Sequence, residues 1–232
     1  RDRNGQWFKW ENRNTNFLYG GPDGGPTHDA PQNGYLNRSR VSLDYIPRDN
    51  NHPYRPAIIF RMAEAYLSYA EALNECSERM SYEQEILNNL NKIRHRAGIA
   101  EYGTGTDENG FTRIKINFAD QKEVRRLIHK ERRVEFVGEG IRYHDLRRWK
   151  TAHYGIGNMN EQGENPDWGV NGPDHGMNYY GTEYTDQGDN AFFKRTKYMD
   201  RVYPRKFYWY PIHQSEIDKD PTLVQGPFWL GE

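Results

Sequence analysis

Two glutamates one helical turn apart, Glu131 and Glu135, have the spacing that most suggests chemistry. They lie in the segment IHKERRVEFVGEGIRYHDLRRWK, residues 128–150. A pair of carboxylates can act as acid and base in glycoside hydrolysis when the two groups flank an open cleft. On a 3.6-residue period, however, both glutamates continue the apolar face that begins at Val124, which predicts that they are partly buried.

A buried carboxylate needs a cationic partner, because an unpaired charge is very costly to remove from water. Arginines on the same and neighbouring segments are the candidate partners: Arg94, Arg96, Arg132, Arg142, Arg147 and Arg148. Guanidinium groups at these positions would hold both carboxylates ionised. We therefore expect no catalytic residues here, and instead a structural ion-pair network that includes Glu131, Glu135, Arg132 and Arg142.

Other groups of residues give weaker indications of catalysis or metal binding. His144 and Asp145 are adjacent, but no Ser or Cys lies in a recognisable nucleophile motif. Cys76 is the single cysteine, and no His or Cys has the spacing of zinc ligands. The acidic stretches 107–109 and 186–189 could supply calcium with oxygen ligands, but neither fits an EF-hand, so solvated turns are expected. With no phosphate-binding glycine loop either, the sequence predicts no metal and no cofactor.

Charge and composition limit the possible partners. The chain has 232 residues, with 32 Lys and Arg against 33 Asp and Glu, so it has no general attraction for nucleic acid or anionic lipid. No stretch approaches the roughly 20 apolar residues of a membrane span. The chain starts at Arg1 without an initiator methionine, which leaves open an export signal or lipid anchor on a longer chain. The 17 Tyr, 10 Phe and 6 Trp beside 22 Gly indicate ordered, aromatic-rich loops.

Four helices are expected to carry the charged residues. In residues 57–75 the apolar side chains recur at three- and four-residue spacing, which predicts one buried face made of Ile59, Met62, Tyr66, Tyr69, Ala70 and Leu73. Residues 82–97 repeat this pattern with Ile86, Leu87, Leu90, Ile93 and Ala97, and Gly98 stands where a left-handed helix cap belongs. The two helices should form an antiparallel hairpin.

The third helix is expected at residues 121–137 and the fourth at residues 141–150. The inward face of the third helix would comprise Val124, Leu127, Ile128, Val134 and Val137. Gly138 and Gly140 should separate the two helices. Helix pairs joined by brief turns are the unit of tetratricopeptide-like arrays. The expected fold is therefore mainly α, with tetratricopeptide-like helical pairs and long, irregular, aromatic-rich loops.

The positions of the long loops predict how the chain is organised into regions. Residues 1–55 are rich in Gly, Pro, Asn and Asp and are expected to be a loop-rich segment of the ligand-facing region. Residues 56–232 would form the helical region, interrupted by a loop excursion at 151–207. A loop of that length inside a compact domain is usually a functional surface.

Four segments resemble, in order and content, the signatures of the C-terminal region of the SusD/RagB family. They are RMAEAYLSYAEALNE (61–75), LNNLNKIRHRAGI (87–99), IHKERRVEFVGEGIRYHDLRRWK (128–150) and YPIHQSEIDKDPTLVQGPFW (210–229). The resemblance implies a non-catalytic, lipid-anchored protein on the outer face of the outer membrane. Such a protein captures glycans or related nutrients for a SusC-like TonB-dependent transporter. Family members are usually about twice this length, and their lipidated cysteine and first helical pairs are absent here.

Sugar binding would use aromatic faces flanked by hydrogen-bonding side chains. The segment near the start of the chain offers the ligand-binding candidates Trp7, Trp10, Asn12, Arg13 and Tyr19. A second cluster lies in the long loop and comprises Trp168, Tyr179, Tyr180 and Tyr184. The alternative is that these aromatics pin the loops to the helices.

Two other functions stay open from the sequence. A glycoside hydrolase would need two open carboxylates at catalytic separation. A tetratricopeptide-type adaptor would bind peptide in a groove, and the sequence also leaves peptide cargo open. The glycan-binding function is the one we expect.

Overall fold

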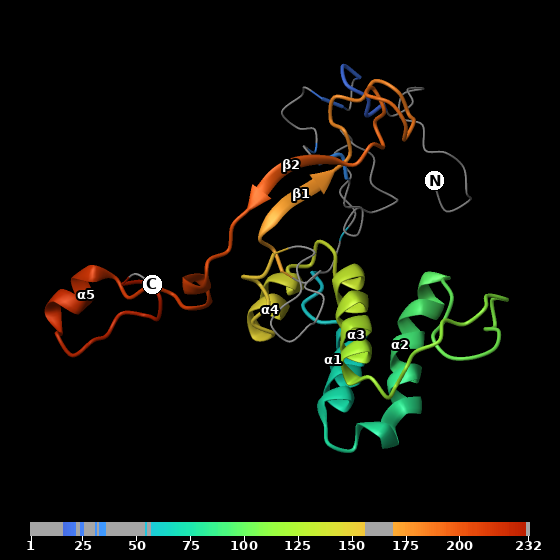
Figure 1. The fold of residues 1–232 in the computed structure, drawn as a ribbon, viewed down its shortest axis with the longest axis horizontal. Helices are drawn as coiled ribbons and strands as arrows, with labels where there is room; N and C mark the ends of the chain where they lie inside the picture. Colours follow the sequence, from blue (N-terminus) through green and yellow to red (C-terminus); the bar gives the residue numbers. More distant parts are fainter. Residues whose placement is uncertain are drawn as a thin grey trace. The chain divides into compact units, whose positions relative to one another are not determined.

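A computed structural model describes residues 16–21, 24–25, 31, 33–35, 54, 57–155 and 169–230. Five of the aromatic and polar residues singled out above lie outside the described residues: Trp7, Trp10, Asn12, Arg13 and Trp168. The chain divides into two compact units (Figure 1). We call Arg55–Asp145 the helical unit, and Arg1–Tyr54 together with Leu146–Glu232 the loop unit. The expected roles of residues 1–55 and 56–232 stay predictions.

The helical unit is built from three long helices. α1 (Met62–Glu75) is joined through a short 3-10 turn to α2 (Glu83–Ala97), and α3 (Gln121–Glu135) follows after a loop. Figure 1 shows the three helices side by side, and α1 packs against both of the others. The prediction of a mainly α fold with paired helices is confirmed.

The core of the helical unit follows from the three- and four-residue spacing of small and aliphatic side chains. Its fully or nearly buried members on the helices are Ala63, Leu67, Ala70, Leu73, Ile86, Leu90, Ile93, Val124 and Ile128. The two alanines of α1 let its neighbours approach closely, because they add almost no bulk to the contact. At the end of α2, Gly98 has φ +67° and closes the helix as expected.

The predicted start and buried face of the first helix are partly wrong. α1 begins at Met62, not at residue 57, and Ile59 is 96% exposed. Met62 and Tyr69 are also exposed. Arg61, the residue before the helix, has extended backbone angles and is held by Glu135 and Glu139, so the helix starts after it.

The third and fourth helices are also shorter than predicted. α3 ends at Glu135, and Val134 and Val137 are exposed, 64% and 62%. α4 is Ile141–Arg148 and spans the boundary between the units. Lys150 has a positive φ of 56°, which ends the helical geometry there.

The loop unit contains a two-stranded antiparallel sheet and a short helix. β1 (Gly172–Gly176) pairs with β2 (Thr196–Arg201), with a bulge between Asp174 and His175. A 3-10 turn (Arg205–Tyr208) and α5 (Gln214–Lys219) follow. Within the described ranges, no helix is both long and apolar enough to cross a membrane.

Candidate functional site

The hairpin of the loop unit carries the first of two segments that form the candidate site. Residues 177–195 connect β1 to β2. The Asn178 amide donates to the Phe192 carbonyl at 2.9 Å, and the Phe192 amide donates to the Glu183 carbonyl at 2.8 Å. A Cβ at Gly181 would collide with the Phe192 backbone, so glycine lets the two sides of the loop meet. The loop is therefore ordered by its own backbone.

The second segment, residues 16–21 and 24–25, lies against this loop (Figure 1). The Tyr19 amide donates to the Gly181 carbonyl at 2.8 Å. At Gly25 a Cβ would lie 2.7 Å from the Tyr179 ring, so only glycine permits this approach. Residues that are far apart in the sequence thus share one surface.

Aromatic rings gather where the two segments meet. We call the following residues the aromatic loop cluster: Tyr19, Tyr179, Tyr180, Tyr184, Phe192 and Phe193. The ring centroids of Tyr19 and Tyr180 are 5.4 Å apart, and Tyr184 lies 5.8 Å from Phe192. Phe192 is buried and anchors the cluster, whereas Tyr180 is 68% exposed and Tyr19, Tyr184 and Phe193 are more than 40% exposed.

Hydrogen-bonding groups border these rings. The Tyr184 hydroxyl accepts from the Phe17 amide at 2.8 Å and donates to the Asn16 side chain at 3.2 Å. The Asn178 side chain bonds the Asp189 carbonyl at 3.1 Å. Exposed aromatic faces bordered by amides can stack on the C–H faces of sugars and bond their hydroxyls. Of the sequence-predicted ligand residues, the structure places Tyr19, Tyr179, Tyr180 and Tyr184 together.

The carboxylate pair of α3 has a different environment. Glu131 accepts from Arg94 of α2 at 2.6 Å and from the Tyr102 hydroxyl at 2.7 Å, and all three residues are buried. The Arg94 guanidinium also lies 4.3 Å from the centroid of the Tyr102 ring. Burial and the neighbouring Glu131 carboxylate raise the pKa of Tyr102, against a smaller opposing effect of Arg94.

Glu135 is bound from two sides. Arg61 bonds its carboxylate and also bonds Glu139 at 2.7 Å, and Arg96 bonds Glu135 at 2.5 Å. The carboxylates of Glu131 and Glu135 therefore both contact guanidinium groups. Arg61 was not among the predicted partners, which were all chosen from residues 94–148, and it lies 74 positions before Glu135 in the sequence.

Arg132, expected as a partner of the glutamates, instead pairs with Asp145. The Arg132 Nε lies 2.9 Å from one oxygen of Asp145, and its Nη2 lies 3.0 Å from the other. Arg132 also bonds the Ser68 hydroxyl at 3.0 Å. Arg142 is half-buried on α4. Asp145 of the adjacent His144–Asp145 pair thus belongs to an ion pair that joins α3 to α4.

The acidic loop at 107–109 is a turn. The Asp107 carboxylate accepts from the backbone amides of Glu101, Asn109 and Phe111 at 2.9 to 3.1 Å. Across the ranges that the structure describes, no group of three or more His, Cys, Asp or Glu residues could hold a metal ion.

Comparison with known proteins identifies the family. The model of the SusD family matches residues 4–229. The chain belongs to the SusD family. It is 35% identical over 109 residues to the SusD-like protein P25 of Formosa agariphila, an alignment that covers 47% of this chain and 18% of that protein.

A solved SusD relative supports the fold. The crystal structure of a SusD-like protein from Bacteroides fragilis matches with a TM-score of 0.58 and 27% identity, over 89% of this chain and 33% of that one. The expected SusD-like fold is thereby confirmed. The chain spans a third or less of the length of these two SusD relatives.

Proposed function

We propose that the chain belongs to a non-catalytic SusD-type protein that binds oligosaccharide or polysaccharide nutrients at the cell surface. The observation that carries this proposal is the exposed aromatic face of Tyr19 and Tyr180, two rings from distant loops held 5.4 Å apart. Family membership supports the same role.

The partner and location follow from the family as further parts of the proposal. The bound glycan would pass to a SusC-like TonB-dependent transporter. The full-length protein would lie on the outer face of the outer membrane through a lipid anchor. The near-neutral charge of the chain suits an uncharged cargo and does not favour nucleic acid.

The ligand surface would extend to residues near the start of the chain. Trp7, Trp10, Asn12 and Arg13 precede Tyr19 by 6 to 12 positions and combine large rings with hydrogen-bonding groups. We propose that they add to the stacking surface of the aromatic loop cluster.

The arginine contacts of Glu131 and Glu135 argue against the hypothesis that the chain is a glycoside hydrolase. A general acid must exchange a proton with the substrate, and a carboxylate bound by guanidinium groups is poorly suited to that step. No catalytic role is therefore proposed for either glutamate.

Substitution of Tyr180, the most exposed ring of the aromatic loop cluster, tests the proposal. A glycan array would first identify an oligosaccharide that binds the full chain. Tyr180→Ala should then weaken its affinity by about 2 kcal/mol, because stacking residues commonly act as hot spots. Tyr69→Ala removes an exposed tyrosine from α1 and should leave the affinity unchanged. Equal affinity of wild type and Tyr180→Ala would remove the aromatic loop cluster from the ligand site.

The tryptophans are tested in the same way. Trp7→Ala and Trp10→Ala should each cost on the order of 2 kcal/mol in affinity and change stability little. Calorimetry with the same oligosaccharide measures both. Unaltered affinity in both variants would leave the described tyrosines as the ligand surface, whereas collapse of the fold would assign the tryptophans to packing.

A further inference from the structure

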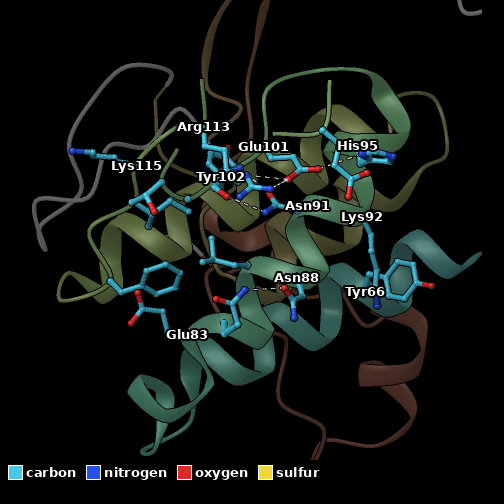
Figure 2. A pocket seen from close by; sticks show the side chains of 17 residues that line it. Tyr66, Glu83, Asn88, Asn91, Lys92, His95, Glu101, Tyr102, Arg113 and Lys115 are labelled. Atoms are coloured by element: carbon cyan, nitrogen blue, oxygen red, sulfur yellow. Dashed lines mark hydrogen bonds and ion pairs between the residues drawn. The ribbon is translucent and has the colours of Figure 1, made fainter. Parts of the chain in front are cut away.

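A groove in the helical unit lies apart from the aromatic loop cluster. It has a volume of about 1150 Å³ and runs between α2 and the segment of residues 101–118 (Figure 2). One wall is a polar stripe of α2 that includes Gln84, Asn88 and Asn91. Neither the expected ion-pair network nor the proposed glycan surface accounts for this stripe.

Asn91 already binds an extended backbone segment. Its side-chain oxygen accepts from the Tyr102 amide at 2.8 Å, and its side-chain nitrogen donates to the Tyr102 carbonyl at 2.9 Å. Figure 2 shows the two residues joined in this way. A carboxamide has a hydrogen-bond acceptor, its oxygen, and a donor, its nitrogen. It therefore complements a peptide backbone, which offers one N–H donor and one C=O acceptor per residue.

The same α2 face continues with two further carboxamides. Asn88 and Gln84 precede Asn91 by about one and two helical turns and line the groove. Gln84 donates to the Asn88 side-chain oxygen at 2.9 Å. Among the described residues, nothing bonds the Gln84 side-chain oxygen or the Asn88 side-chain nitrogen. Together these two atoms offer one acceptor and one donor to a second backbone.

The opposite wall offers a backbone edge outside regular secondary structure. Lys115, Ile116 and Asn117 donate no backbone hydrogen bond to any described residue. Between the walls, Leu87 and Ile116 supply an apolar surface that one aliphatic side chain could cover. An exposed edge of this kind can pair with a peptide by strand addition.

The aromatic residues of the groove do not suit a sugar. Lys92 covers the Tyr66 ring, with its ammonium 4.3 Å from the centroid. Tyr102 and Phe118 are buried. The groove therefore lacks the open ring faces on which sugars stack. Its charged rim contains both signs, with Glu83 and Glu108 against Lys92 and Lys115, so it has no preference for a strongly charged ligand.

We propose that this groove binds an extended segment of a partner protein, with one aliphatic side chain over Leu87 and Ile116. Gln84 and Asn88 are four residues apart, or about 6 Å along the helix. An extended chain covers that length in about two residues. The recognised segment is thus short, and its backbone is read by Asn88 and Gln84.

The test uses the full chain and a library of N-acetylated, C-amidated hexapeptides with a central Leu or Val, screened by fluorescence anisotropy. Members of the library should bind, and Asn88→Ala should weaken them about tenfold, the effect of losing one or two hydrogen bonds. Asn88 is exposed and Ala is the better helix former, so this variant should keep its fold. Gln214→Ala is the control, because Gln214 also bonds the side chain four residues on and lies on α5.

Three results would overturn the proposal. They are the absence of binding by every peptide in the library, equal affinity of wild type and Asn88→Ala, and loss of glycan binding in Asn88→Ala. The peptide site is independent of the proposed glycan site, so Tyr180→Ala should retain peptide binding.

Discussion

Glu131 and Arg94 form a buried ion pair in which each charge depends on the other. Glu131→Gln leaves the Arg94 guanidinium buried without its carboxylate. Breaking a buried pair in this way should lower the free energy of unfolding by about 3 kcal/mol. Urea denaturation of the variant measures the loss, and ligand specificity should stay unchanged.

An exposed ion pair provides the control for this substitution. Glu75 lies 2.6 Å from Arg125, and both side chains are partly solvated. Glu75→Gln should cost less than about 1 kcal/mol, because water screens such pairs. A Glu131→Gln variant that stayed fully stable but lost a measurable turnover would instead support the glycoside hydrolase hypothesis.

Tyr102 links stability to high pH. Because its pKa is raised in the folded protein, its contribution is fully present below the ordinary tyrosine pKa near 10 and is lost as the pH rises toward the folded value. Stability should therefore fall above about pH 10. Tyr102→Phe should reduce the slope of this fall in chemical denaturation. An unchanged slope would assign the alkaline loss to other groups.

The partners of the buried charges could be predicted only in part. Periodicity places Glu131 on the inward face of α3 and proposes Arg94 among its partners. It could not identify Arg61 as the partner of Glu135, since these residues are 74 positions apart. It also assigned Arg132 to the glutamates, although Arg132 pairs with Asp145. Partner choice depends on how the helices pack.

At the scale of single elements, Lys150 marks a strained helix end. Its φ of 56° follows the last turn of α4, where the Thr151 amide bonds the Leu146 carbonyl at 3.0 Å. Lys150→Gly should stabilise the protein by about 1 kcal/mol, because glycine adopts this conformation without strain. Thermal unfolding measures the change.

The same substitution at Lys130 of α3 should change the stability in the opposite direction. It is exposed in a regular helix, so Lys130→Gly should destabilise the protein by about 1 kcal/mol. If Lys150→Gly destabilised the protein, the contacts of the lysine side chain would stabilise it by more than the strain of the positive φ destabilises it.

The extents of the helices show where a periodic pattern fails. Val134 and Val137 fit the apolar spacing of α3 but are exposed, whereas Phe136 between them is buried in the core. Ile59 fits the spacing of α1 but lies in the irregular segment before it. The end of α2 was predictable, since Gly98 has the local conformation that a glycine cap requires.

The aromatic loop cluster could not be predicted as one surface. Each of its two loops was predicted to be aromatic and functional from composition. Their contact depends on hydrogen bonds between residues more than 160 positions apart, such as that from Phe17 to Tyr184. Such pairing leaves no periodic signal in the sequence.

At the scale of the whole molecule, the two units would have different roles. The buried ion pairs of the helical unit suit a scaffold, and the exposed rings of the loop unit suit a ligand surface. Both the helical fold and the family could be predicted from the four sequence signatures. The identity of the glycan could not, because the spacing of exposed rings sets which sugars fit.

The most direct measurement is calorimetric titration of the full chain with the oligosaccharide that an array identifies, followed by analysis of the recovered sugar. We expect saturable binding, a loss of about 2 kcal/mol in affinity for Tyr180→Ala, and a sugar recovered intact. Absence of binding by every glycan on the array, or recovery of a cleaved sugar, would contradict the proposed glycan-binding function.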